Sequence, residues 1–371
     1  MRCLVTGGGT GGHIYPAIAV AKAVQEILPR AGVLYVGTRT GMESSLVPKE
    51  GLDFESVRSS GIVGKSPFLA IKGAWRATLG MGDARRIIKS FRPDVVLGTG
   101  GYVSGPVVLT AKIMGLPCAI QEQNAVPGKT NLALSKRVDK VFAAWEYSLR
   151  YFPREAAVKV TGNPVKGSLF TASKPEGRSS FGLENKFTLL VLGGSRGAQT
   201  LVEAAIRIAG SDNPDFQVLL ITGWEYYEKA VAALGASPES GIEGAKTGNI
   251  TIRPYVYNME VAYQACDLVL GRAGGMTLAE ITALGLPSII VPSPNVVGNH
   301  QEYNARALED AGAAVVVREG PVAIEEIEGA VLRILRDPEE LRKMGEAARR
   351  IGRPGAAMDI ARELIALTRR R

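Results

Sequence analysis

The sequence predicts an α/β protein built from two doubly wound domains in tandem. Short runs rich in Val, Ile and Leu alternate with helix-length segments along the chain, as in parallel sheets covered on both faces by helices. A length of 371 residues suits about two domains, each large enough for its own core. Both halves open on one plan, a strand followed by a glycine loop, at residues 3–12 and 189–198. These observations favour two Rossmann-like domains.

The apolar runs give the expected strands in chain order. In the first half they cover residues 2–6, 33–37, 94–98, 117–121 and 139–144. In the second half they cover residues 187–193, 217–222, 267–271, 287–292 and 313–317. Helix-length segments between strands allow the crossover connections that parallel neighbours require. We therefore expect parallel sheets.

The domain boundary is expected within residues 160–167, where Gly-Asn-Pro interrupts the chain. The first domain then spans residues 1–163 and the second spans residues 164–352. A final segment, about residues 353–371, follows a Gly-Arg-Pro-Gly break and has helical periodicity with a basic end. The periodicity alone leaves open which domain this helix packs on.

The composition is that of a globular protein with anionic partners. An excess of 44 Lys and Arg over 36 Asp and Glu gives a net charge of +8, which suits nucleic acid, phosphorylated metabolites or an acidic membrane surface. Cys3, Cys118 and Cys266 are far apart in sequence, so we expect buried thiols and neither a disulfide framework nor a zinc site. No apolar run reaches the roughly 18 residues that span a bilayer, so membrane contact is expected to be peripheral.

Four glycine loops follow expected strands, at residues 7–12, 98–106, 193–199 and 271–280. Such loops let main-chain N–H groups approach an anion, and the N-terminus of the following helix adds the positive end of its dipole. In open α/β sheets, ligands gather at the carboxyl ends of the strands, where these loops lie. We therefore expect a cleft between the domains that binds phosphorylated ligands.

Other phosphate-binding motifs fit less well. Gly7, Gly9 and Gly12 satisfy the dinucleotide fingerprint, but the position expected for the ribose-binding acid is near Arg39, and the next acid is Glu43. NAD is thus disfavoured, while NADP stays open. The GKS and GKT triplets lack the upstream glycine of a P-loop. No Asp-x-Asp clamp for a metal–nucleotide complex occurs.

Polar residues follow several of the loops. His13 and His300 are the only histidines, and His13 is either a catalytic or substrate-contact group or a structural residue. Residues 121–128 at a strand end are either ligand contacts or turn residues, and residues 299–304 either cap a helix or line a sugar. Glu280 either binds a ribose or is a first-turn acid favoured by the helix dipole.

Seven motifs together point to a known family: GGTGGHIYP, GTGGYVSGP, EQNAVPG, GNPV, GGSRGA, RAGGMTLAEI and NHQEYNA. In this order and at these separations they resemble the MurG family of peptidoglycan glycosyltransferases over essentially the full chain. The resemblance implies a GT-B fold, with the acceptor-side domain first, the UDP-GlcNAc domain second and the C-terminal helix returning to domain one. It implies inverting transfer of GlcNAc from UDP-GlcNAc to the C4 hydroxyl of MurNAc in lipid I, giving lipid II and UDP.

The resemblance also implies site residues. Thr10, Gly11 and Gly12 are expected at the donor sugar and acceptor pyrophosphate, beside His13. Lys166 stands where many relatives have arginine, so it supplies a point charge instead of a bidentate fork. Residues expected in the acceptor and pyrophosphate loops are Gly9, Gly100, Gly101, Tyr102 and Ser104. The remaining expected contacts are Asn124 and Gln301 on GlcNAc, Ser195 and Arg196 near the diphosphate, Val256 on the uracil, and Gly275, Met276, Thr277, Leu278, Ala279 and Glu280 along the nucleoside, with Glu280 on the ribose.

The implied chemistry needs a base and a stabilised leaving group. An unperturbed histidine titrates at about 6.5, so His13 is the expected base, with pyrophosphate binding as the alternative role. Main-chain N–H groups, helix N-termini, Ser195 and Arg196 are expected to stabilise the departing diphosphate. No cofactor and no dedicated protein site for a metal are expected, and assistance by a divalent ion is left open.

A lipid-linked acceptor implies a docking surface at the cytoplasmic face of the bacterial cell membrane. Residues 64–77 mix apolar and basic side chains, as an interfacial anchor for anionic lipid does, although a core-facing helix with solvated lysines has the same composition. This patch comprises Lys65, Phe68, Leu69, Ile71, Lys72, Trp75 and Arg76. Cell-wall or division proteins are further conceivable partners, and no nucleic-acid motif is present.

Three different functions remain open at the level of sequence. Another GT-B lipid or natural-product glycosyltransferase would share the fold without the joint GTGGYVSGP and EQN motifs. An NADP oxidoreductase would bind its cofactor. A non-catalytic sugar-nucleotide or nucleic-acid binder would bind without turnover, in the latter case with a steep salt dependence.

Overall fold

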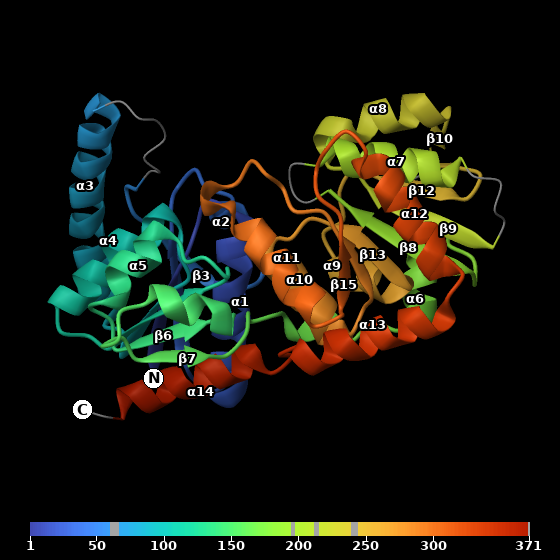
Figure 1. The fold of residues 1–371 in the computed structure, drawn as a ribbon. Helices are drawn as coiled ribbons and strands as arrows, with labels where there is room; N and C mark the ends of the chain where they lie inside the picture. The colour runs from blue at the N-terminus through green and yellow to red at the C-terminus, as the bar shows by residue number, and fades with distance from the viewer. Residues whose placement is uncertain (60–66, 194–196, 211–214, 239–243, 370–371) are drawn as a thin grey trace. The chain divides into compact units, whose positions relative to one another are not determined.

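The computed structural model contains two compact units, residues 1–166 with 353–371 and residues 167–352 (Figure 1). It describes residues 1–59, 67–193, 197–210, 215–238 and 244–369, with the backbone alone at residues 67–77, at Pro238 and at Val297. Each unit is a sheet with helices on its faces, so the predicted two-domain α/β fold is confirmed.

Unit 1 contains a seven-stranded sheet in the order β3-β2-β1-β4-β5-β6-β7, with parallel pairing throughout. Its carboxyl ends carry the first two glycine loops. The elements are β1 Arg2–Thr6, α1 Gly11–Ile27, β2 Gly32–Gly37, α2 Glu43–Lys49, β3 Asp53–Ser56, α3 Pro67–Phe91, β4 Val95–Gly98, α4 Gly101–Ile113, β5 Cys118–Glu122, α5 Lys129–Ser135, β6 Lys140–Ala143, η1 Glu146–Tyr151, β7 Val158–Val160 and α14 Ala356–Thr368.

The central strand β1 shows why this sheet is buried on both faces. Alternate side chains of a strand point to opposite faces. Cys3 and Val5 pack with α1 and α14, whereas Leu4 packs with residues of α3 and α4 on the other face. All three side chains have no exposed surface. A continuous apolar strand is therefore required, as the sequence has it.

Unit 2 contains an eight-stranded sheet in the order β10-β11-β12-β9-β8-β13-β14-β15. The elements are η2 Gly167–Phe170, α6 Lys174–Ser180, β8 Phe187–Leu192, α7 Gln199–Ala209, β9 Phe216–Ile221, α8 Trp224–Leu234, β10 Ser237–Pro238, β11 Ala245–Thr247, β12 Ile250–Arg253, α9 Met259–Ala265, β13 Leu268–Gly271, α10 Gly275–Leu284, β14 Ser288–Ile290, η3 Val297–Asn299, α11 His300–Asp310, β15 Ala314–Val316, α12 Ala323–Leu335 and α13 Pro338–Ile351.

One edge of this second sheet departs from the predicted parallel pairing. β10 and β11, and β11 and β12, pair antiparallel. Only Gly248 and Asn249 separate β11 from β12, a length that suits a hairpin and excludes a parallel crossover. Gly248 has φ of +52°, the left-handed conformation that such a turn uses. The remaining five pairings are parallel.

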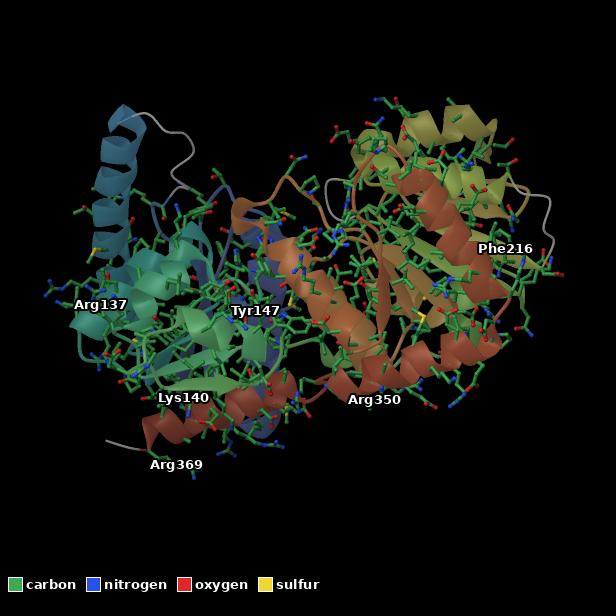
Figure 2. All side chains as sticks on the ribbon, viewed as in Figure 1. Arg137, Lys140, Tyr147, Phe216, Arg350 and Arg369 are labelled. Carbon is green, nitrogen blue, oxygen red and sulfur yellow. The ribbon has the colours of Figure 1, made fainter. Side chains whose placement is uncertain are left out.

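The C-terminal helix α14 packs within unit 1. Ile360, Ala361 and Leu364 are fully buried in the same cluster as α1. On its polar side, Glu363 forms ion pairs with Lys159 of β7 at 2.6 Å and with Lys140 of β6 at 3.2 Å. Lys140 is labelled in Figure 2. The hydrogen bond from Lys159 is the largest contribution that lowers the pKa of the Glu363 carboxyl below its usual value. Apolar burial and these two ion pairs thus attach the helix to the sheet of unit 1.

Candidate active site

The first glycine loop of unit 1, Gly7–Thr10, packs against the loop after β4. A Cβ atom on Gly7 would lie 2.1 Å from Oγ1 of Thr99. Gly101 has φ of +78°, and a Cβ atom there would lie 2.1 Å from the carbonyl oxygen of Gly8. Side chains at either position would collide with main chain or a buried hydroxyl, so glycine is required for the two loops to meet.

The buried carboxylate of Glu43 is hydrogen-bonded to the first loop. Glu43 has no exposed surface and accepts hydrogen bonds from the Thr38 N–H at 3.0 Å, the Thr38 hydroxyl at 2.7 Å and the Gly9 N–H at 3.4 Å. Tyr35 donates to the Gly7 carbonyl at 2.8 Å. Burial, followed by the charge of Glu43, raises the pKa of the Tyr35 phenol well above its usual value. Glu43 therefore supports the loop itself.

His13 lies on the first turn of α1 and is partly exposed. Its Nδ1 atom lies 3.1 Å from the Thr99 carbonyl oxygen and 3.0 Å from Oε1 of Gln123. Its own carbonyl accepts from the Thr99 hydroxyl at 2.6 Å. A Cβ atom on Gly100 would lie 2.8 Å from Nδ1, so the ring is packed against the second loop. The second loop and the residue that follows β5 thus fix the imidazole.

Gln123 belongs to the EQNAVPG motif, but no specific role is expected for it. The motifs single out its neighbour Asn124, but it is Gln123, only 2% exposed, that touches His13. The two residues are 110 positions apart, so no local pattern connects them. The run of polar residues after β5 is the available signal, because buried glutamine requires hydrogen-bond partners.

The other expected residues of these loops fall into two groups. The first group is accessible. Two residues are exposed, Gly9 and Thr10, and three are partly exposed, Gly11, Gly12 and Tyr102. The Tyr102 ring lies over Gly9. Ser104 is fully buried. Its hydroxyl lies 3.0 Å from the Thr6 carbonyl and 2.7 Å from the Gly100 carbonyl, to one of which it donates, and it accepts from the Gly100 N–H at 3.0 Å. We therefore assign Ser104 to holding the loop and not to contacting an acceptor.

A second buried carboxylate shapes the loop after β5. Glu122 accepts from the N–H groups of Asn124 and Gly128, both at 3.0 Å, and from the Asn131 amide at 2.8 Å. The Asn124 side chain also donates to it at 3.3 Å and is partly exposed. Asn124 is thus presented at the carboxyl end of β5, the edge that also carries His13.

Lys166, the last residue of unit 1 before the chain enters unit 2, forms an ion pair with Glu50 at the end of α2. Its Nζ atom also lies 4.9 Å from the centre of the Tyr15 ring, within cation–π range. Its side chain is 30% exposed. A substrate phosphate would therefore have to compete with Glu50 for this charge.

In unit 2, the third glycine loop includes Ser195 and Arg196, which lie outside the described residues. The fourth loop leads from β13 into α10, which begins at Gly275 behind Gly274. Residues 275–280 therefore form the first turns of this helix. Gly275 and Leu278 are buried, while Met276, Thr277, Ala279 and Glu280 are partly exposed.

The Glu280 carboxylate accepts a hydrogen bond from the Tyr263 hydroxyl at 2.8 Å. Tyr263 is 2% exposed, and burial followed by the charge of Glu280 raises the pKa of its phenol well above the usual value. The tyrosine therefore stays protonated and donates, which fixes one carboxylate oxygen. A carboxylate has two oxygens with about four acceptor sites, which is the acceptor chemistry that binding of a ribose diol requires.

A charged cluster beside the glycine loops of unit 2 is not indicated by the sequence. Arg272, directly after β13, forms an ion pair with Glu319 at 2.5 Å and donates to the Val291 carbonyl at 3.1 Å. The Thr200 hydroxyl on α7 donates to Glu319 at 2.8 Å. The cluster links segments far apart in sequence, so only the fold brings it together.

The remaining expected contacts with the donor nucleotide, Val256 and Gln301, lie elsewhere in unit 2. Val256 follows β12 and is partly exposed beside Tyr255 and Tyr257, whose rings meet edge-on with centres 4.9 Å apart. Oε1 of Gln301, on α11, accepts from the Ser293 N–H at 2.9 Å and so fixes the loop after β14. Because Oε1 of Gln301 is the acceptor in this hydrogen bond, the NH₂ group of the side chain is the part that can donate.

The expected membrane patch cannot be placed by its side chains. Lys65 lies outside the described residues, and Phe68, Leu69, Ile71, Lys72, Trp75 and Arg76 fall on the part of α3 whose backbone alone is described. Among the helices described, none combines the length and apolarity needed to cross a bilayer.

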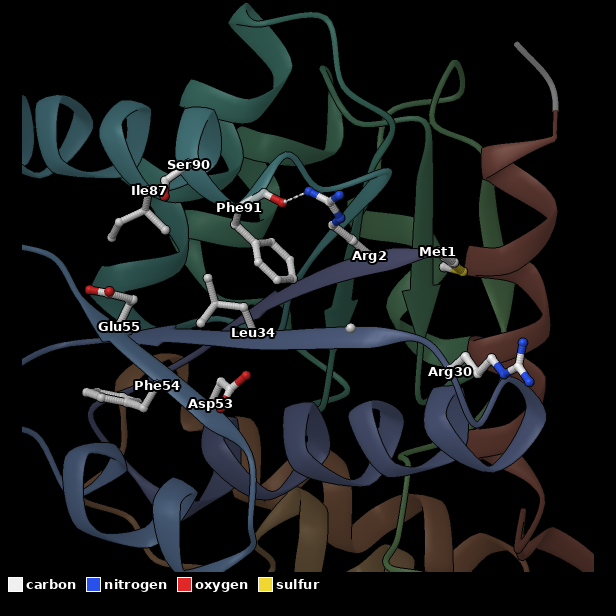
Figure 3. A pocket seen from close by; sticks show the side chains of 11 residues that line it. Met1, Arg2, Arg30, Leu34, Asp53, Phe54, Glu55, Ile87, Ser90 and Phe91 are labelled. Carbon is white, nitrogen blue, oxygen red and sulfur yellow. Dashed lines mark hydrogen bonds between the residues drawn. The ribbon is translucent and has the colours of Figure 1, made fainter.

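A hollow of about 730 Å³ in unit 1 lies away from all these loops (Figure 3). Its walls include Arg2 and Gly32, which begin β1 and β2, and Phe91, which ends α3. Arg2 donates to the Phe91 carbonyl at 2.9 Å. The hollow therefore opens at the amino ends of the strands, whereas ligands of such sheets bind at the carboxyl ends.

The chain matches two family models, the glycosyltransferase family 28 N-terminal domain over residues 3–143 and the C-terminal domain over residues 188–360. It is 44% identical to the UDP-N-acetylglucosamine--N-acetylmuramyl-(pentapeptide) pyrophosphoryl-undecaprenol N-acetylglucosamine transferase of Desulforamulus reducens, with 97% of each chain covered. It is also 44% identical to the protein of that name from Moorella thermoacetica, with 96% of each covered.

Solved structures agree with this relationship. The crystal structure of Acinetobacter baumannii MurG is similar with a TM-score of 0.74 and 28% identity, covering 98% of this chain and 99% of that one. A UDP-GlcNAc 2-epimerase from Neisseria meningitidis shares the fold with a TM-score of 0.70 at 16% identity, covering 99% and 100%. The chain therefore belongs to glycosyltransferase family 28 and, within it, to the MurG family.

Proposed function

We propose that the chain transfers GlcNAc from UDP-GlcNAc to the C4 hydroxyl of MurNAc in lipid I, giving lipid II and UDP. The observation that carries the proposal is the 44% sequence identity, over nearly the full length, to relatives named for this transfer. In the reaction, the C4 oxygen forms a bond to the anomeric carbon of GlcNAc while the bond from that carbon to the diphosphate breaks. The bonding electron pair leaves with UDP, and the C4 proton must go to a base.

We assign the proton to Nε2 of His13. Nδ1 faces the Thr99 carbonyl and Gln123, so the opposite ring nitrogen is the one directed to a substrate. The charge that develops on the ring would be shared through Nδ1–H with two fixed acceptors. The exposed main chain of Gly9, Thr10 and Gly12 supports acceptor or pyrophosphate binding beside it.

We assign the donor nucleotide to unit 2. Glu280 would accept from the ribose hydroxyls, Val256 would contact the uracil, and Gln301 would donate to GlcNAc. The leaving diphosphate would lie at the N-termini of α7 and α10, the helices that follow β8 and β13. Ser195 and Arg196 of the loop before α7 belong to the same assignment. We propose no resident metal, so turnover should persist in the presence of EDTA.

The direct test measures UDP release from UDP-GlcNAc with and without a lipid I analogue. Release that requires the analogue, with one UDP for each disaccharide formed, supports the transferase. UDP-GlcNAc binding without acceptor-dependent release would instead favour a sugar-nucleotide sensor. Reduction of NADP would favour an oxidoreductase, and transfer to a lipid without MurNAc would favour a different GT-B glycosyltransferase.

We also propose that residues 64–77 dock on an anionic membrane surface at the cytoplasmic face. The mixed apolar and basic composition supports it. Co-sedimentation with vesicles containing anionic lipid should fall when Phe68 and Trp75 are both replaced by serine. A matched pair of serine substitutions at Ile113 and Leu149, two exposed apolar side chains outside this segment, is the control.

A further inference from the structure

We infer that Gln123, held by Gln121 and Asn163, is a positioning residue that fixes the His13 imidazole as its Nδ1–H tautomer. The inference rests on the proposed role of His13 as the base. It concerns three amides, two of which lie in the run at residues 121–128 that the sequence assigns either to ligand contacts or to a turn. Their side chains are 0%, 2% and 3% exposed for Gln121, Gln123 and Asn163, so they are part of the interior and not of the substrate surface.

The orientation of each amide is fixed by a main-chain carbonyl, which can only accept hydrogen bonds. Nε2 of Gln123 lies 2.6 Å from the Thr99 carbonyl oxygen. Nε2 of Gln121 lies 3.2 Å from the Glu122 carbonyl oxygen. Nδ2 of Asn163 lies 3.0 Å from the Gln123 carbonyl oxygen. Each of these ends must therefore be the NH₂ group.

With the orientations fixed, the three side chains form one directed series. Gln121 donates to Oδ1 of Asn163 at 2.8 Å, and Gln123 donates to Oε1 of Gln121. The oxygen of Gln123 is then the end that faces His13, 3.0 Å from Nδ1. The amide orientations required by the three main-chain carbonyls are also the orientations required by the hydrogen bonds between the side chains. Flipping any of the three amides would place two acceptor oxygens against each other.

This direction decides the tautomer of His13. Nδ1 faces two oxygens, the Thr99 carbonyl and Oε1 of Gln123, and neither can donate a proton to it. Nδ1 must therefore carry the hydrogen, and in the neutral ring Nε2 holds the lone pair that accepts the C4 proton. The opposite tautomer would direct its lone pair into the protein, against two acceptors. The amide series selects the useful form without placing a charge beside the ring.

The test is nitrogen-15 NMR of histidine-labelled protein at a pH where the ring is neutral. The chain has only two histidines, so His300→Gln identifies the His13 signals. We expect a protonated Nδ1 and an unprotonated Nε2. In Gln123→Met one acceptor is lost, the Nδ1–H fraction should fall, and kcat should fall about 10-fold to 100-fold, as for outer partners of other functional histidines. KM for UDP-GlcNAc should stay within about 3-fold.

Two controls separate positioning from general damage. Gln217→Met removes a similarly buried amide, 6% exposed, from β9 of unit 2 and should leave the His13 signals unchanged. Gln123→Glu retains the acceptor that faces Nδ1 and should retain Nδ1–H, although its second oxygen replaces the NH₂ donor to the Thr99 carbonyl and should lower the melting temperature. If Gln123→Met does not fold, Asn163→Ala, which removes the donor to the Gln123 carbonyl, should shift the tautomer ratio in the same direction.

A dominant Nε2–H form in the native protein, or an unchanged tautomer ratio in Gln123→Met, would overturn the inference. The proposed base role is tested separately by His13→Ala. If that variant keeps its turnover while Gln123→Met shifts the tautomer, the positioning by Gln123 stands and the assignment of the base falls.

Discussion

The two units share a strand–glycine loop–helix opening but hold it with different chemistry. In unit 1, buried Glu43 accepts from main-chain and hydroxyl groups of the loop region, and His13 contacts a carbonyl and a neutral amide. In unit 2, Arg272 pairs with Glu319, and Glu280 accepts from the phenol of Tyr263. The Nδ1 atom of His13 thus meets an uncharged carbonyl and an uncharged amide, whereas the loop before α10 lies beside an ion pair. The proposed division of labour between the units therefore rests on the residues around the loops and not on the shared fold.

The largest expected effect tests the role of unit 1. His13→Ala should lower kcat by at least about 100-fold, because general-base catalysis contributes on that scale. The dissociation constant for UDP-GlcNAc should stay within about 3-fold, since the donor is assigned to unit 2. Steady-state UDP release and calorimetric titration measure the two quantities. A smaller loss of kcat would reduce His13 to a binding contact.

The matching substitution in unit 2, Glu280→Gln, should change the affinity for UDP. Glu280→Gln should weaken UDP binding about 10-fold or more, because hydrogen bonds to a charged acceptor contribute roughly 1.5–3 kcal/mol. Tyr263→Phe is the control, since it removes the donor to Glu280 and keeps the carboxylate. Its effect on UDP affinity should be smaller. Equal affinities for UDP in Glu280→Gln and the native chain would contradict the ribose assignment.

Loss of the buried Glu43 carboxylate in unit 1 should lower local stability much more than loss of an exposed carboxylate in unit 2. Glu43→Gln keeps the shape but presents an NH₂ group to buried donors, which costs about 1–3 kcal/mol. Hydrogen exchange of the β1 and α1 amides measures this in unit 1 alone. Glu325→Gln, at the exposed pair with Arg207, is the control and should leave exchange in unit 2 nearly unchanged.

The smallest expected effect is common to both units. Burial raises the pKa of the Cys3 thiol from 9.0 to about 12, and burial also raises the pKa of Cys266. The folded state thus holds these protons more tightly than the unfolded state. The contribution of Cys3 to stability is complete below its unfolded pKa of 9.0 and is lost as pH rises toward about 12. In Cys3→Ala, the fall of the melting temperature across this range should be shallower.

The sequence predicts the long buried strands and the loops, but not the short edges. The apolar runs of β1, β4, β8 and β13 are continuous because both faces are covered. β3, with alternating exposed residues, and the hairpin β11–β12 lack that signal. The helix α14 joins unit 1 because its apolar side packs against α1. Helical periodicity in the sequence does not specify this contact.

The candidate site is predictable where chemistry is local and unpredictable where it depends on tertiary pairing. His13 and Glu280 stand directly behind glycine loops, so motif and position both indicate them. Gln123 and Arg272 acquire partners only when distant segments meet. Ser104 belongs to a motif yet is fully buried, because a motif does not distinguish a residue that holds a loop from one that contacts substrate.

The most direct test of this division is a crystal structure with bound UDP. We expect the ribose hydroxyls within hydrogen-bond distance of the Glu280 carboxylate, the uracil at Val256, and the diphosphate at the N-termini of α7 and α10. UDP bound instead against the first glycine loop, with its diphosphate at Gly9 and its ribose near Glu43, would contradict the assignment of donor and acceptor to the two units.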